Sequence, residues 1–183
     1  MEKIFRDYEA QLDSLRQQEL ESSAHELQRA EFAKVQQLDR LAAQQGKNIR
    51  ICCSSSISWN AELETVGNGW VQLRSGTENI LLPLRSIMWW EGGNHHAQVD
   101  TGTLMRKLNF SYAFRALSIA RTPLRIFHRD FVTTTEGTIE KVGLDFIEVA
   151  LHPLDGQYRS RHITGMRTVG LENIGAACSL RSA

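Results

Sequence analysis

An internal repeat is the strongest constraint that this 183-residue chain places on its fold. Residues 61–73 and 137–149 match position by position: three pairs are identical, and four more exchange one apolar side chain for another. The identical pairs are Glu64/Glu140, Val66/Val142 and Gly67/Gly143, and the similar pairs are Leu63/Ile139, Trp70/Phe146, Val71/Ile147 and Leu73/Val149. The match continues in the same order on both sides, with residues 49–51 resembling 124–126 and residues 82–87 resembling 169–174. This order indicates two copies of one structural unit.

Each copy is predicted to be rich in β-strands. Apolar and polar residues partly alternate, and β-branched and aromatic residues are common in both copies. Residues 66–70 and 142–146 are typical of a tight turn between two strands, in which we expect Gly67 and Gly143 to adopt a positive φ. Five short strands closed into a small barrel fit the length of each copy and leave no exposed sheet edge. We therefore predict two five-stranded barrels.

Residues 1–45 form a predicted helical segment. Residues 2–45 contain no Gly or Pro and are rich in helix-forming residues, with a narrow apolar stripe along the segment. The stripe slips near Ser23, where Ser23 and Glu26 form a capping-box pattern, so the segment is either a helical hairpin or one long helix with a phase shift. Gly46 fits a helix C-terminal cap. A narrow stripe favours self-association as a coiled coil or docking onto a partner; alternatively, the helices pack on the β-rich part of the same chain.

A second, shorter helix is predicted before the second copy, over residues 111–121, with Ser111 as its N-cap and Thr122-Pro123 ending it. The polar stretch at 91–98 contains two glycines and reads as a linker. The predicted organisation is a helical segment at 1–45, a first barrel at 46–91, a linker at 92–105, and a helix with a second barrel at 106–183. The fold class is α+β, mainly β.

A helix followed by five bent strands resembles the Sm/LSm/Hfq superfamily of small barrels. The whole chain is also similar to an uncharacterised actinobacterial protein family, through residues 7–13, 66–73, 114–121 and 137–149. The Sm resemblance implies RNA binding, but only Gly137-Thr138-Ile139 matches the start of the first Sm motif. Ile147 and Val71 stand where that motif has the Asn of its uridine pocket, and apolar side chains supply no hydrogen bonds to a base edge.

Composition excludes several classes of protein. Lys and Arg together number 21, as do Asp and Glu, so the chain is not a uniformly basic nucleic-acid binder. No run of about 18 apolar residues is present to span a membrane, and the start of the chain lacks the apolar core of a secretion signal. Cys52, Cys53 and Cys178 are an odd number without metal-ligand spacing, so we expect a reducing cytoplasm and no metal.

The net charge of zero combines an acidic N-terminal segment with a basic C-terminal copy. Residues 1–45 hold 6 Lys and Arg against 9 Asp and Glu, whereas residues 101–183 hold 11 against 7. Arg125, Arg129, Arg159 and Arg161 lie in the basic second copy and form a phosphate-binding patch if they converge. Alternatively, these arginines neutralise the acidic helical segment within or between chains.

Candidate interface residues are apolar or aromatic side chains that the repeat does not assign to a core. Trp89 and Trp90 end the first copy, and neighbouring strand residues point to opposite faces, so one ring is expected to be exposed. Trp70 and Phe146 share one repeat position and are predicted to be core. The interface candidates are Tyr8, Leu12, Leu15, Trp59, Trp89 and Trp90.

Enzyme motifs are absent from the sequence. His95 and His96 lie in the linker, Ser54, Ser55 and Ser56 have no Gly-x-Ser-x-Gly context, and the glycines at 92–93 are followed by no Lys-Ser/Thr. We therefore predict no catalytic, cofactor or metal site and no small-molecule substrate. The expected function is a cytoplasmic scaffold or adaptor that assembles through its helices and barrels, by self-association or with a protein partner. The alternative is binding of RNA or another nucleic acid by the second copy.

Overall fold

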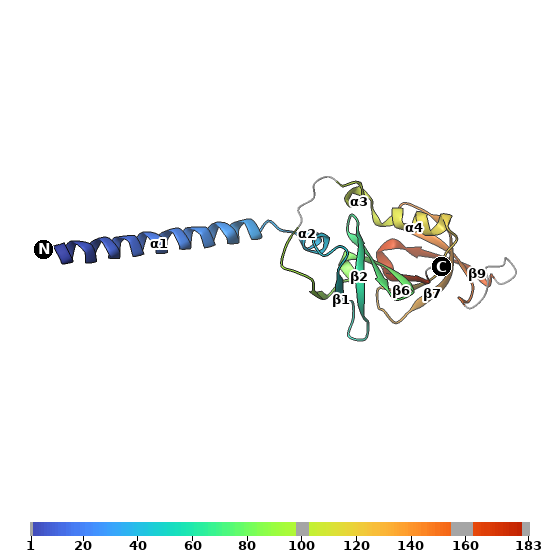
Figure 1. Ribbon diagram of the computed structural model, residues 1–183. Helices are drawn as coiled ribbons and strands as arrows, with labels where there is room; N and C mark the ends of the chain where they lie inside the picture. The colour runs from blue at the N-terminus through green and yellow to red at the C-terminus, as the bar shows by residue number, and fades with distance from the viewer. Residues whose placement is uncertain (1, 98–102, 155–162, 181–183) are drawn as a thin grey trace. The chain divides into compact units, whose positions relative to one another are not determined.

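The computed structural model describes residues 2–97, 103–154 and 163–180, and for residues 2–15 and 180 it describes the backbone alone. It divides into two compact units, Met1–Gln36 and Gln37–Ala183. The prediction of an α+β chain made mainly of strands is confirmed (Figure 1). No helix among the described residues is long and apolar enough to cross a membrane.

The first unit is a single long helix, α1 (Glu2–Phe32). It continues through Ser23, so the capping-box pattern at that residue does not begin a new helix. The chain leaves helical structure at 33–36, and a short helix, α2 (Gln37–Ala42), belongs to the second unit. The helical segment was predicted to extend to residue 45. The unit boundary lies earlier because Leu41 of α2 is fully buried in the core of the β-rich part.

The described residues of the second unit form ten strands, five from each repeat. The N-terminal repeat consists of β1 (Asn48–Cys52), β2 (Ser58–Val66), β3 (Trp70–Ser75), β4 (Glu78–Pro83), the 3-10 helix η1 (Leu84–Ser86) and β5 (Trp89–Gly92). The helices α3 (Leu104–Lys107) and α4 (Phe110–Ile119) follow it. The C-terminal repeat consists of β6 (Pro123–His128), β7 (Thr134–Val142), β8 (Phe146–Leu151), β9 (Gly165–Gly170), the 3-10 helix η3 (Leu171–Asn173) and β10 (Ile174–Leu180).

The two repeats pair their strands in the same way. The N-terminal repeat has the order β5-β1-β2-β3-β4, and the C-terminal repeat has the matching order β10-β6-β7-β8-β9. Even an irregularity is shared. The β2–β3 register shifts between Leu63 and Thr65, and the β7–β8 register shifts between the matching residues Ile139 and Lys141. A bulge bends its strand and increases its twist, so both repeats bend at the same point.

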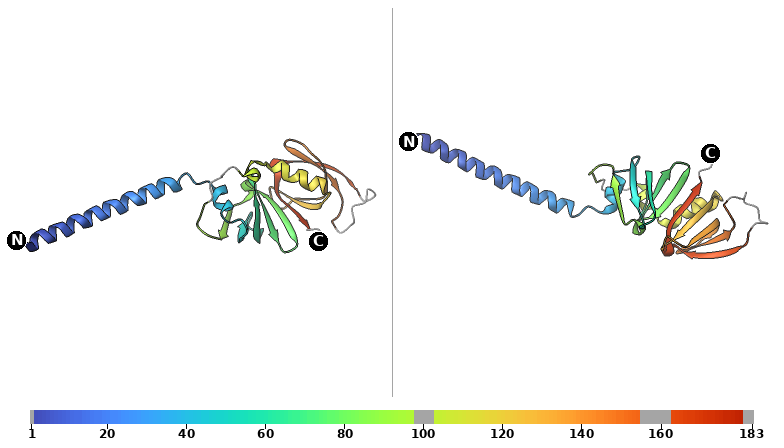
Figure 2. Two further views of the ribbon diagram at one scale, coloured as in Figure 1. Left: turned by 45° about the horizontal axis from the view of Figure 1, so that its top comes forward. Right: turned by 90° about the horizontal axis from the view of Figure 1, so that it is seen from below.

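The prediction of two separate closed barrels is wrong. The ten strands form one antiparallel sheet, in which β4 of the N-terminal repeat pairs with β10 of the C-terminal repeat. The right-hand view of Figure 2 shows β10, in red, beside the green strands of the N-terminal repeat. The sheet is open, because β5 and β9 stand at its two ends. Because β4 pairs with β10, the backbone N–H and C=O groups along this side of both strands have hydrogen-bond partners, as they would in two closed barrels.

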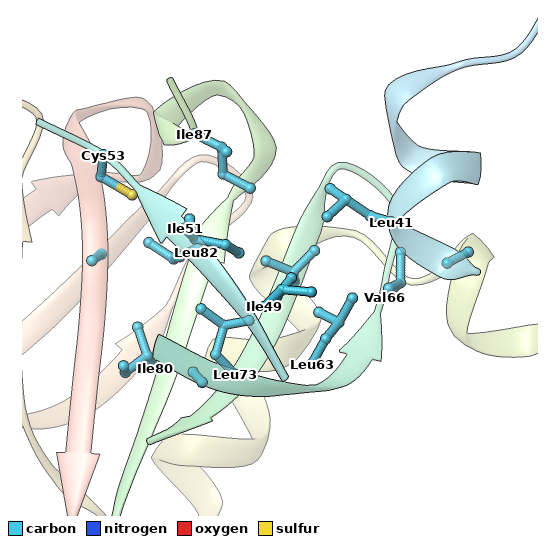
Figure 3. Close-up of a cluster of buried hydrophobic side chains, with 14 of the residues drawn as sticks. Leu41, Ile49, Ile51, Cys53, Leu63, Val66, Leu73, Ile80, Leu82 and Ile87 are labelled. Atoms are coloured by element: carbon cyan, nitrogen blue, oxygen red, sulfur yellow. The ribbon is translucent and has the colours of Figure 1, made fainter. Parts of the chain in front are cut away.

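Two apolar clusters form the core; each comes mainly from one repeat and is covered by the helix before that repeat. Figure 3 shows the first core, where Leu41 of α2 meets Ile49 of β1 and Leu63 of β2. In the second core, Phe114 of α4 takes the corresponding place against β7 and is fully buried. The apolar periodicity of α4 therefore serves packing within the chain.

Two local predictions need correction. Gly67 and Gly143 do not adopt a positive φ; instead, a side chain at either position would overlap the ring of Trp70 or Phe146, which lies against the glycine. The N-cap of α4 is Asn109, whose side chain accepts a hydrogen bond from a backbone N–H. The predicted cap, Ser111, lies inside the helix and donates to the Asn109 side chain at 2.8 Å.

Candidate functional site

The junction between the repeats is an edge-to-edge pairing of β4 with β10. Leu81 lies opposite Ala177 and Ile80 opposite Cys178, and only Cys178 of these four side chains is more than slightly exposed. Antiparallel pairing satisfies the backbone groups of both edge strands, and the side chains on either face are then packed together. The junction is therefore a continuous part of the fold.

Side chains outside these two strands reinforce the junction. The Trp59 ring of the N-terminal repeat meets the Phe127 ring of the C-terminal repeat edge to face, at 6.5 Å between centroids. Trp70 Nε1 donates to the Leu108 backbone oxygen at 2.8 Å, and only 2% of this tryptophan is exposed. Arg85 Nη2 donates to backbone oxygens of the C-terminal repeat, including that of Ile174 at 3.3 Å. Partial burial lowers the pKa of this guanidinium.

The open edge strand β9 is the counterpart of β4. Val71 of β3 pairs with Leu82 of β4, and the matching residues Ile147 and Val169 pair in the C-terminal repeat. Ile80 lies two residues before Leu82 in β4, and Arg167 lies two residues before Val169 in β9. Ile80 and Arg167 therefore occupy the same position in the two repeats. β4 joins the N-terminal repeat to β10. Its counterpart β9 in the C-terminal repeat is the last strand of the sheet and has no neighbouring strand on its outer side among the described residues.

The open edge strand β5 is likewise the counterpart of β10. Ile51 of β1 pairs with Trp90 of β5, and the matching residue Ile126 pairs with Ala177 of β10. The next position along each edge strand is Glu91 in β5 and Cys178 in β10. The sheet therefore ends in two strands whose counterparts, β4 and β10, pair with each other inside the chain, and both end strands have a free side in the described structure.

Apolar side chains are exposed beside both open edges. Met166 of β9 is 56% exposed and Phe146 of β8 is 37% exposed, although the matching residue of Phe146 is the buried Trp70. The prediction that Phe146 is core is therefore wrong. Its ring lacks the cover that α3, α4 and β10 give to the same position in the N-terminal repeat. At the other edge, Trp89 is 42% exposed.

The structure separates the predicted aromatic interface residues. The centre of the exposed Trp89 ring lies 5.6 Å from the guanidinium carbon of Arg50 in β1, whereas Trp90 packs against the first core. Trp59 lies at the junction inside the chain. Tyr8, Leu12 and Leu15 fall within α1, and their side chains lie outside the described part of the chain. Exposed apolar side chains on the described part of α1 are Leu20, Leu27 and Phe32.

Two of the four arginines predicted to bind nucleic acid are described. Arg125 Nε donates to the Glu136 carboxylate at 2.7 Å, so its charge is partly neutralised by its own sheet. Arg129 is exposed after β6. Arg159 and Arg161 lie outside the described residues.

Ser54, His128 and two of the cysteines take part in structural contacts or packing. His128 Nε2 lies 2.8 Å from the Thr135 hydroxyl, and Ser54 Oγ accepts from the Ile57 backbone N–H in a turn. Burial raises the pKa of the Cys53 and Cys178 thiols to about 12, so both are protonated and poorly nucleophilic near neutral pH. No group of His, Cys, Asp or Glu among the described residues has the arrangement of a metal site.

Comparison of the chain with models of known protein families gave no match, and comparison with curated protein sequences gave none either. The open edges themselves escaped sequence reasoning, because the prediction of closed barrels left no strand at an edge. The repeat alignment contained a usable indication: it places Arg167 of β9 where β4 has the apolar Ile80.

Proposed function

We propose that this protein is a non-enzymatic scaffold whose copies assemble head to tail, β9 of one copy pairing with β5 of the next. The observation that supports this proposal is the β4–β10 junction inside the chain, which joins the counterparts of these two edges. A head-to-tail contact presents different surfaces on the two partners, so each copy keeps one open edge for a further copy. Such a chain of sheets offers a repeated surface on which other proteins gather.

The junction register predicts which residues meet. Transferring the Ile80–Cys178 pair to the open edges places Arg167 opposite Glu91 of the next copy. Directly opposed strand residues have Cβ atoms about 5 Å apart, close enough for an ion pair. Among the described residues, each of these side chains pairs with a group of its own sheet. Arg167 Nη1 donates to the Thr135 hydroxyl at 2.8 Å, and Glu91 accepts from Arg50 at 3.3 Å.

The same transfer places Thr168 opposite Trp90 of the next copy. It also adds a strand beside β9, next to β8, on which Phe146 is exposed; at the internal junction β10 takes the corresponding place beside β4. Burial of apolar surface supplies most of the favourable free energy, and the charged pair chiefly selects the register.

One internal contact has no counterpart at the open edges. Arg85 reaches carbonyl groups across the internal junction, and the residue at the matching position is Glu172, which has no hydrogen to donate when ionised. We therefore expect the contact between chains to be weaker than the junction within the chain. Assembly should be reversible and should increase with protein concentration.

The helix α1 provides a second route of association. Its described side chains are exposed, and Leu20 and Leu27 lie seven residues apart, which is the spacing of a coiled-coil seam. Pairing of this helix with α1 of another copy would bury both leucines. The two routes are separable, because α1 belongs to a unit of its own.

Charge reversal at the two edges tests the sheet contact. We expect the wild-type mass in multi-angle light scattering to rise above 20.7 kDa with concentration. Glu91→Lys and Arg167→Glu should each lower that mass, because each places like charges opposite one another. Mixing the two variants should restore assembly, since every contact between unlike variants then pairs opposite charges. Arg115→Glu, on the exposed side of α4, is the control and should assemble like the wild type.

A wild-type protein that stays at 20.7 kDa at every concentration would contradict the proposed function. Deletion of residues 1–36 separates the routes: loss of all assembly on this deletion would assign association to α1 and reject the sheet contact. Nucleic-acid binding through Arg125 and Arg129 is the competing outcome. It predicts a gel shift of RNA at low salt that weakens steeply as salt rises and when both arginines become Ala.

A further inference from the structure

The turn between β2 and β3 is held by the segment that connects α3 to α4. The backbone N–H of Asn68 in this turn donates to the Leu108 oxygen at 3.0 Å, and Trp70 Nε1 donates to the same oxygen at 2.8 Å. One carbonyl group of the connecting segment therefore binds both the turn and the ring that follows it. In this setting Trp70 is only 2% exposed.

The matching turn between β7 and β8 is built alike but lacks this cover among the described residues. The Gly143 N–H donates to the Phe146 oxygen at 2.8 Å, as the equivalent groups do in the first turn. Leu144, at the position of Asn68, is nevertheless 84% exposed, and Phe146 is 37% exposed. The Leu144 N–H has no hydrogen-bond partner among the described residues. Adjoining exposed apolar side chains of this kind mark a surface that a protein partner can bury.

The segment that covers the first turn has a counterpart before α2. The fifth residue of each helix that precedes a repeat fills the core, Leu41 in α2 and Phe114 in α4. Val35 stands two residues before α2, as Leu108 stands two residues before α4, and a lysine precedes each of them. The two segments therefore share one pattern, a lysine and then a branched apolar residue at the entry to a helix.

The proposed sheet contact brings this counterpart to the turn at 143–146. At the internal junction β10 pairs with β4, and the segment before α4 reaches the turn between β2 and β3. At a head-to-tail contact, β5 of the next copy stands beside β9, and the helix before that copy's repeat is α2. Residues 33–36 of the next copy are joined directly to α2, so they take the place of the α3–α4 connection.

The charges beside the turn at 143–146 favour a basic segment. Asp145 and Glu172 are both exposed. They lie near one another, because the Asp145 backbone oxygen accepts from the N–H of Leu171, the neighbour of Glu172, at 2.7 Å. The matching positions of the N-terminal repeat are Gly69 and Arg85, so the acidic pair belongs to the uncovered turn alone.

Residues 32–35 offer the complementary surface. The Lys34 side chain is 71% exposed, and its ion pair with Glu31 is equally exposed, so a second carboxylate can reach it. Phe32 is 60% exposed, and Val35 is partly buried. The segment thus combines one positive charge with apolar side chains, which matches two acidic residues beside an exposed leucine and phenylalanine.

We propose that residues 32–35 of the next copy cover the turn at 143–146, with Lys34 beside Asp145 and Glu172 and with Val35 against Leu144. This inference rests on the head-to-tail assembly proposed above, and it names the segment that completes that contact. It adds to the sheet pairing a second area of contact that does not depend on hydrogen bonds between strands.

Cysteine pairing between copies tests the contact directly. Full-length Val35→Cys and Leu144→Cys, one of them carrying a mass tag, are mixed where the wild type associates and are oxidised with copper phenanthroline. We expect a mixed disulfide-linked dimer on a non-reducing gel, because the two positions adjoin. Glu21→Cys, at an exposed position of α1, replaces Val35→Cys in the control and should give less than about a tenth of that product. Wild type mixed with either variant accounts for the native cysteines.

Charge exchange measures what the contact contributes. Lys34→Glu and Asp145→Lys should each weaken association about three- to fivefold in sedimentation velocity, the size expected for an exposed ion pair. A mixture of the two variants should regain most of the wild-type strength, since every contact between unlike variants then pairs opposite charges. Arg115→Glu, on the exposed side of α4, should associate like the wild type.

The outcomes separate this contact from the sheet assembly on which it rests. A wild type that stays monomeric would overturn both. If the wild type assembles and the Glu91 and Arg167 variants behave as expected, a mixed disulfide no stronger than in the control, or unchanged association of both charge variants, would overturn this contact alone. A disulfide inside one chain of the dilute Val35→Cys/Leu144→Cys double variant would show that the chain covers its own turn and would also overturn the contact between copies.

Discussion

Trp70 and Phe146 offer a direct test of the two-repeat interpretation, because they occupy one position in two copies of the same unit. Trp70 is 2% exposed and Phe146 is 37% exposed. If Trp70 is buried because of the neighbouring repeat, then replacing Trp70 by Ala must lower the free energy of unfolding more than replacing Phe146 by Ala. We therefore predict unequal losses of stability for Trp70→Ala and Phe146→Ala.

The structure sets the expected size of this difference. Truncating a fully buried aromatic residue to Ala costs about 3–5 kcal/mol. Trp70 also donates a 2.8 Å hydrogen bond to the Leu108 carbonyl, and losing it adds about 1 kcal/mol. Phe146 keeps about a third of its surface in water, so scaling the same range gives a cost of roughly 2–3 kcal/mol. The expected difference is about 2–3 kcal/mol.

Urea unfolding followed by circular dichroism measures both losses without relying on tryptophan fluorescence. The protein concentration should be low, so that association between copies does not cover Phe146. Trp70→Phe is the companion variant: it keeps a ring and removes the hydrogen bond, and should cost about 1–2 kcal/mol. Equal losses for the two alanine variants, within about 0.5 kcal/mol, would refute the claim that the neighbouring repeat makes these positions different.

Three further predictions concern the packing of the second unit. Gly67→Ala should lower the free energy of unfolding by about 1–3 kcal/mol, because the added methyl group overlaps the Trp70 ring; chemical denaturation measures this. The raised folded-state pKa of Cys178, about 12 against 9.0, means that its burial favours folding below pH 9 and that this contribution is lost as the pH rises from about 9 towards 12. Thiol labelling at pH 8 should accordingly be much faster in urea than in the native protein, and equal rates would contradict the burial of this thiol. Arg106 and Asp39 form a 2.6 Å ion pair with side chains only 9% and 10% exposed, so Asp39→Ala should cost about 3–5 kcal/mol in thermal or urea unfolding, whereas a loss below about 1 kcal/mol would show that the charges are not desolvated.

The sequence predicted the parts of the fold that depend on local pattern. The repeat alignment placed the turns at Gly67 and Gly143 between two strands, and the structure has β2, β3, β7 and β8 on either side of them. It placed a helix before the C-terminal repeat, although the cap is Asn109 and not Ser111. Turn residues, alternation and apolar spacing are properties of neighbouring residues, so they can be recognised without knowledge of the partner element.

The tertiary structure alone decided how the two repeats join, and hence which surfaces remain open. An edge strand can satisfy its backbone hydrogen bonds by closing its own barrel or by pairing with another sheet, and the residues of β4 are compatible with both. The pairing of β10 with β4 set β5 and β9 at the ends of the sheet, and together with α3 and α4 it buried Trp70 while the counterpart Phe146 stayed exposed. These differences arise between identical repeat positions, so no local pattern encodes them.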